Sequence, residues 1–128
     1  KIKKIAEACQ QDFIAKAHYV VVVCSNPLRL IKSYEEKGKI YSRQQAGAAI
    51  ENFLLKLTDE KLSTCWIGYF IEKQIKKIIN IPEGIDIEAV FPIGFEAEKP
   101  TKKYGTQKSK IELENIIYFD EYGNERMK

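Results

Sequence analysis

The sequence has few of the residues that build metal centres. It contains one histidine and three cysteines, Cys9, Cys24 and Cys65, and these form no Cys-x-x-Cys pair and no His/Cys cluster. Structural zinc and iron–sulfur sites need such clustered ligands, so the sequence offers no site of either kind. Three widely spaced cysteines also favour reduced thiols over a disulfide scaffold, and we therefore expect a cytoplasmic protein.

Long apolar runs and a dominant charge are also missing. No stretch approaches the roughly 18 apolar residues that cross a bilayer, and the N-terminal residues form no apolar signal segment. Lysine and arginine number 21 and aspartate and glutamate 18, which leaves a net charge of only +3. This balance is not that of a nucleic-acid-binding surface. We expect neither a membrane nor a nucleic acid as partner.

The composition suits one compact domain over residues 1–128. Its 128 residues, 45% of them hydrophobic, match the commonest domain size. The apolar spacing predicts both helices and strands. We expect helices over 3–16, 42–57 and 73–80, a strand buried on both faces over 19–24, further strands over 87–95 and 116–120, a turn or short extended piece over 64–68, an irregular segment or short helix over 28–41, and a loop over 96–110.

The helix over 42–57 carries the strongest pattern. Ser42 and Gln45 have the spacing of a capping box, which predicts that the helix begins at Ser42. Three small residues, Gly47, Ala48 and Ala49, would let a second helix approach closely. The helix can therefore serve as the core helix, as the contact with a second copy of the chain, or as both, and we favour both.

Three motifs in fixed order carry a resemblance to a known family. Leu-Ser-Thr-Cys-Trp-Ile-Gly at 62–68 follows the central helix, Ile-Pro-Glu-Gly stands at 81–84, and Ala-Val-Phe-Pro-Ile-Gly-Phe at 89–95. This set resembles the C-terminal part of the nitroreductase family, the FMN-dependent NAD(P)H oxidoreductases. The resemblance runs from about Ile5 to Tyr122.

The resemblance implies an α+β fold, a mainly antiparallel sheet flanked by helices, in a homodimer that holds each flavin between its subunits. It leaves open whether the terminal strand, Ile116–Asp120, is exchanged between the partners. The implied cofactor is FMN, with NADH or NADPH as electron donor. The implied reaction is hydride transfer through the flavin to a small-molecule acceptor such as a nitroaromatic or a quinone, so no side chain need act as acid or base.

By the same resemblance, Cys65, Trp66, Ile67 and Gly68 form the turn that meets the flavin. The amide between Ile67 and Gly68 would face flavin N5, and a glycine lets the backbone approach an aromatic ring. The Trp66 side chain would form one wall of the flavin site. Without the flanking motifs, the same residues would be read as a plain turn with a buried tryptophan. A redox role for the Cys65 thiol is the less favoured reading, and we expect Cys65 to be a buried small hydrophobe.

Lys108 and Lys110 resemble the family's pair of cations for the FMN phosphate. Residues two apart on an extended chain point the same way, so both can meet one phosphate. A solvated basic loop is the alternative. The lone histidine, His18, is interpreted as structural because no Ser/His/Asp or Cys/His set can be assembled around it.

The sequence departs from the family pattern in two places. The opening Arg-x-Ser-x-Arg and Asn-x-Gln-Pro-Trp motifs are absent, so we expect a longer protein to carry them and expect slow turnover without them. The alternative function is a dimeric flavin-binding module that is non-catalytic or binds FMN weakly. Lys61 stands where the family often has glycine, which predicts either an unfavourable helix C-cap there or a different end to the helix.

Overall fold

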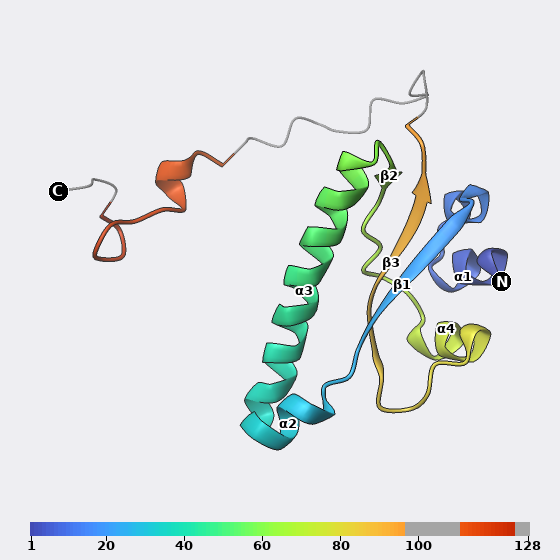
Figure 1. Ribbon diagram of the computed structural model, residues 1–128, viewed down its shortest axis with the longest axis horizontal. Coiled ribbons are helices and arrows are strands. Elements are labelled where there is room, and N and C mark those ends of the chain that lie inside the picture. The colour runs from blue at the N-terminus through green and yellow to red at the C-terminus, as the bar shows by residue number, and fades with distance from the viewer. Residues whose placement is uncertain (97–110, 125–128) are drawn as a thin grey trace. The chain divides into compact units, whose positions relative to one another are not determined.

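The computed structural model of the chain describes residues 1–96 and 111–124, which belong to two compact units, 1–96 and 97–128. The first unit contains the sheet and the long helices (Figure 1). Its three strands are β1 (Tyr19–Ser25), β2 (Ser63–Thr64) and β3 (Asp86–Gly94). They lie in the order β1-β3-β2, and both pairings are antiparallel. The antiparallel sheet expected from the sequence is confirmed for this unit.

Helices cover both faces of this sheet (Figure 1). The long helix α3 runs beside one face, and its N-terminus is joined to α2. The helices α1, η1 and α4 lie across the opposite face. The α+β class, with helices flanking an antiparallel sheet, is therefore confirmed. The bounds of these helices are α1 (Ile2–Ala8), the 3-10 helix η1 (Asp12–Lys16), α2 (Leu28–Tyr34), α3 (Glu36–Asp59) and α4 (Glu72–Ile79).

Strand alternation divides the core into two clusters, one on each face of the sheet. Along β1, Val20 and Val22 pack toward α1 and α4, whereas Val21 and Val23 pack toward α3. These four valines are only partly buried, so the predicted burial on both faces is wrong. The reason is position, because β1 is an edge strand of the three-stranded sheet.

A β-bulge at Glu88 changes the alternation in β3. Val23 pairs with Ala89 but Cys24 pairs with Ile87, so Glu88 is the extra residue. As a result Ile87 joins the cluster under α1 and α4, while Ala89 joins the cluster under α3. The Glu88 carboxylate accepts a hydrogen bond from the Ser25 hydroxyl, which holds the end of β1 against the bulge.

The helix predicted over residues 3–16 is broken. α1 ends at Ala8, Gln10 takes a left-handed conformation with φ 54°, and η1 begins at Asp12. The break buries Cys9 and Ile14 in the same cluster, at 1% and 0% exposure. A continuous helix would carry Ile14 onward along the helix axis, so tertiary packing outweighs the local helical pattern here.

The central helix begins six residues earlier than predicted. α3 starts at Glu36, so Ser42 lies inside the helix, and the predicted capping box is wrong. Glu35, with φ 50°, both ends α2 and precedes α3, and the Gly38 N–H donates to its carbonyl. The segment predicted to be irregular or a short helix is thus α2 and the first turns of α3.

The C-terminus of α3 confirms the unfavourable cap expected at Lys61. This residue has φ 57°, and the Leu62 N–H donates to the Leu57 carbonyl at 2.8 Å, which closes the helix.

Replacing Lys61 by glycine is expected to raise the free energy of unfolding by about 1 kcal/mol, because glycine adopts this backbone without a Cβ penalty. Chemical denaturation measures the difference. Lys39→Gly is the matched control, since Lys39 lies within α3, where glycine should destabilise by about 1 kcal/mol. A destabilised Lys61→Gly variant would contradict the cap assignment.

The described part of the second unit contains one short 3-10 helix, η2 (Leu113–Asn115). The strand predicted over Ile116–Asp120 is wrong, since no strand occurs within 111–124. Instead Asp120 has φ 62°, and the Phe119 N–H donates to the Asn124 carbonyl at 2.8 Å. The left-handed residue and this hydrogen bond turn the backbone within the segment, so it is not extended there.

Candidate functional site

The segment 63–68 runs antiparallel to β3 beyond the short strand β2. Ile67 and Val90 exchange both backbone hydrogen bonds, at 3.0 and 3.1 Å, in the same register as the β2 pairs. Between them the ladder is interrupted opposite Pro92, which has no N–H to offer. The Thr64 hydroxyl donates to the Pro92 carbonyl at 2.8 Å instead. The proline in β3 therefore explains why the chain leaves strand geometry at Cys65.

Trp66 rests on the core with one edge and is otherwise accessible. Its ring meets Phe91 at 5.5 Å between centroids, edge to face, and Phe91 meets Phe53 of α3 in the same way at 5.5 Å. Phe91 is fully buried, whereas Trp66 is 47% exposed. A plain turn with a buried tryptophan, the alternative considered from the sequence, does not describe this arrangement.

The space beside the α-carbon of Gly68 is open. A Cβ added there would meet only the Trp66 indole nitrogen, at 3.9 Å, and the residue has no positive φ. Nothing in the described chain therefore requires glycine at this position. The Gly68 N–H has no backbone acceptor among the described residues, whereas the Ile67 N–H is bonded to Val90. Of the amides of Ile67 and Gly68, only that of Gly68 is free to donate to a ligand.

Cys65 is exposed, so its expected burial is wrong. It lies at a hollow of about 300 Å³ that residues of η1, Phe13 and Lys16, also line. These two residues carried no functional signal in the sequence, because only the packing of η1 beside the end of β3 brings them to Cys65. They place a cation and an exposed aromatic ring next to the turn.

Glu72 fixes the chain just after the turn. Its carboxylate accepts the Ile87 N–H at 3.3 Å and forms an ion pair with Lys76 at 2.7 Å. The hydrogen bond from Lys76 is the main cause that holds the pKa of Glu72 below its ordinary value. Because the folded pKa is lowered, this stabilisation is present at neutral pH and is lost as the pH falls through that pKa. The start of α4 is thereby tied to the start of β3.

The other residues expected at a site are distributed as follows. Lys108 and Lys110 lie outside the described residues, so their phosphate role stays a prediction. His18 is exposed, and the ring it meets among the described residues is that of Tyr19. Residues 1–96 and 111–124 contain no cluster of histidine, cysteine or acidic side chains that could hold a metal. In the same ranges, no helix is long and apolar enough to cross a membrane.

Comparison with known proteins identifies the chain's relatives. The model of the nitroreductase family matches residues 1–95. A protein of Methanocaldococcus jannaschii, whose name provisionally assigns it to the nitroreductases, is 32% identical over 76 residues. That match covers 59% of this chain but only 38% of the relative. The chain thus matches well under two thirds of that relative's length.

Solved structures show the same fold. A nitroreductase family protein from Clostridium novyi aligns with a TM-score of 0.66 at 26% identity, over 94% of this chain and 64% of that one. An FMN-dependent nitroreductase from Clostridium difficile aligns with a TM-score of 0.64 at 18% identity, over 95% of this chain and 72% of that one. The second likeness is evidence of fold alone.

Proposed function

The chain belongs to the nitroreductase family, and we propose that it is an FMN-dependent oxidoreductase that transfers hydride from NADH or NADPH to a nitroaromatic, a quinone or a related acceptor. The observation that carries the proposal is the unpaired amide of Gly68 beside open space. One of the structural relatives is named as an FMN-dependent nitroreductase, which agrees with this proposal.

The turn fits a planar, hydrogen-bonding cofactor such as a flavin. The Gly68 N–H is a donor whose position is set by the bonded pair Ile67–Val90 next to it, and a backbone amide does not ionise. The absence of a Cβ leaves room for a ring to approach. Trp66 supplies an exposed apolar wall that excludes water from one side. FMN, when bound, supplies the redox chemistry, and this chain's residues supply orientation.

The experiment is a flavin titration followed by a turnover assay. The purified chain is titrated with FMN, and quenching of flavin fluorescence gives the dissociation constant. Oxidation of NADH and of NADPH is then followed with menadione and with nitrobenzene as acceptors. Saturable FMN binding with acceptor-dependent oxidation supports the proposal. FMN binding without turnover supports instead the non-catalytic flavin-binding module, and the absence of any FMN binding overturns both.

Lys108 and Lys110 are proposed to contact the FMN phosphate. A charge-assisted hydrogen bond contributes about 1.5–3 kcal/mol, so the double alanine variant should bind FMN at least about ten-fold more weakly. Riboflavin, which lacks the phosphate, should be affected far less. Titration of both flavins measures the difference, with Lys102→Ala/Lys103→Ala as the control pair. Equal losses for FMN and riboflavin would show that the loop has no phosphate role.

We also propose that the protein is a homodimer. The long helix α3 leaves Ile40 and Leu55 exposed, at 56% and 61%, with Gly47 and Ala48 between them. Exposed apolar side chains on a helix, with small residues between them, are suited to a contact with further protein. A stable dimer of this kind buries about 2,000 Å² or more.

Light scattering at micromolar concentration, with FMN present, is expected to give twice the chain mass of 14.8 kDa. Leu55→Glu should shift the mass toward the monomer, because it places a charge in the proposed contact, whereas Lys32→Glu on α2 serves as the charged control. A monomer mass for the unaltered protein would exclude the dimer.

A further inference from the structure

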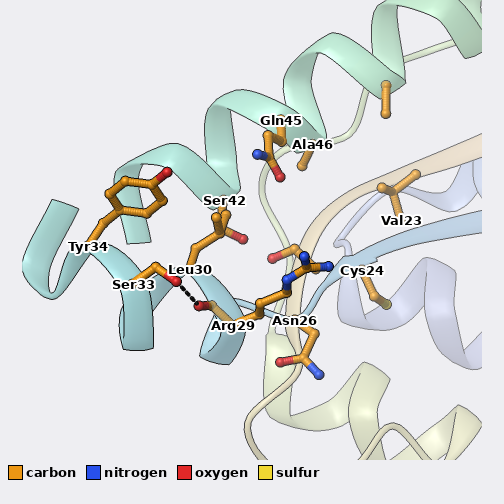
Figure 2. Close-up of a pocket in the computed structure, with 12 residues that line it drawn as sticks. Val23, Cys24, Asn26, Arg29, Leu30, Ser33, Tyr34, Ser42, Gln45 and Ala46 are labelled. Carbon is orange, nitrogen blue, oxygen red and sulfur yellow. Dashed lines mark hydrogen bonds between the residues drawn. The ribbon is translucent and has the colours of Figure 1, made fainter. Parts of the chain in front are cut away.

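A second cavity lies between the end of β1, α2 and the first half of α3 (Figure 2). Its volume is about 630 Å³, within the range of small-molecule sites, roughly 300–1,000 Å³. None of its lining residues belongs to the turn Cys65–Gly68. The proposed flavin contacts therefore do not account for it.

Three polar side chains line this cavity without a partner among the described residues. Among the described residues, the Arg29 guanidinium has no ion-pair partner, and the Gln45 side chain has no hydrogen-bond partner. Ser42 is only 5% exposed, yet its hydroxyl has no hydrogen-bond partner there either. No side-chain nitrogen or oxygen among the described residues is both buried and unsatisfied, so the Ser42 oxygen is accessible, and it is free to bind a ligand in the cavity that Ser42 lines.

The remaining wall combines aliphatic and polar side chains, and the close packing of α2 against α3 holds it in place. Val23, Leu30 and Ala46 present aliphatic carbon to the cavity. Gly38 of α3 touches the backbone of Leu30, which holds the two helices at a short separation. Figure 2 shows the Arg29 side chain extending from α2 into the space that Ser42 and Gln45 overlook from α3. The cavity therefore offers a cation and polar side chains beside aliphatic carbon.

We propose that this cavity binds a small organic carboxylate. Arg29 would receive the carboxylate through its planar fork, and the Ser42 hydroxyl would donate to the same group. Val23, Leu30 and Ala46 would cover the apolar body of the ligand. A monoanion fits better than a phosphate dianion, because Arg29 is the one cation among the described residues that line the cavity, and the Ser25 hydroxyl, which also lines it, donates to the Glu88 carboxylate.

The test uses para-fluorobenzoate as the probe and fluorine NMR of the full chain, with and without FMN. The neutral para-fluorobenzamide is the matched probe. Saturable binding of the benzoate is expected with a dissociation constant on the order of 1 mM, since so small a ligand has few contacts. The benzamide should bind at least about ten-fold more weakly, and FMN should not displace the benzoate.

Three variants locate the binding. Arg29→Gln should weaken benzoate binding at least about ten-fold, and Ser42→Ala about three-fold or more, while benzamide binding changes little. Arg43→Gln is the matched control, because Arg43 adjoins Ser42 in α3 but does not line the cavity. Circular dichroism verifies that each variant is folded.

Four results would overturn the carboxylate site: no saturable benzoate binding, equal affinity for benzamide, equal losses in Arg29→Gln and Arg43→Gln, or displacement of benzoate by FMN. None of these depends on whether the chain turns over NAD(P)H. The site and the proposed oxidoreductase function can therefore fail separately.

Discussion

Replacing Gly38 by alanine is expected to destabilise the protein by about 3 kcal/mol, the upper range for overpacking. An added Cβ would overlap the backbone carbonyl of Leu30 and the amide of Ile31, and these atoms belong to α2 rather than to a flexible side chain. Relief therefore requires α2 to move away from α3. Denaturant unfolding followed by circular dichroism measures the loss.

Gly94→Ala is the matched control for this variant. A Cβ at Gly94 meets nothing within 4 Å, and the residue lies at the end of β3 with no positive φ. Alanine should there raise the free energy of unfolding by about 0.5–1 kcal/mol through the loss of backbone freedom in the unfolded chain. If Gly38→Ala unfolds at the same denaturant concentration as Gly94→Ala, the close contact of α2 with α3 is wrong.

Replacing Gly68 by valine is expected to lower FMN affinity at least about ten-fold, the equivalent of 1.4 kcal/mol. Valine would place branched carbon in the open space beside the Gly68 N–H, where we propose that the flavin approaches. The fold should tolerate the change, because the only neighbour of a Cβ is the Trp66 indole nitrogen at 3.9 Å. Loss of flavin would then reflect binding rather than unfolding.

FMN titration and thermal unfolding of the same preparation separate these two effects. Lys32→Val is the control, since it places the same side chain at an exposed position of α2 that lines neither the turn nor the hollow at Cys65. The flavin assignment predicts normal unfolding for both variants and weak FMN binding only for Gly68→Val. Full flavin content and full turnover in Gly68→Val would remove Gly68 from the site.

Several elements could be predicted from the sequence because local pattern and tertiary structure agree there. The helix expected over 73–80 is α4 (Glu72–Ile79), and the strand expected over 87–95 is β3 (Asp86–Gly94). Asn80 tolerates the left-handed backbone that ends α4, and Pro82 follows it. At Lys61 the departure from glycine correctly predicted a strained cap.

Other features depend on contacts between distant segments. The capping pattern at Ser42 was misleading because α2 packs against Gly38 and moves the start of α3 back to Glu36. The continuous helix over 3–16 fails because Cys9 and Ile14 are buried in one cluster only if the chain turns at Gln10. The local pattern carries no information about these partners.

The sequence by itself determined the family, the α+β class and the turn that contains Gly68, because these depend on motifs and on short-range periodicity. Only the tertiary structure decided that the Gly68 amide is free to donate and the Ile67 amide is not, since the Ile67 N–H is bonded to Val90, 23 positions along the chain. It also decided that Arg29 and Ser42 share a cavity, because α2 and α3 fold back on each other at Glu35. Hydrogen-bond partners and cavities arise from segments brought together by packing, which a one-dimensional pattern does not record.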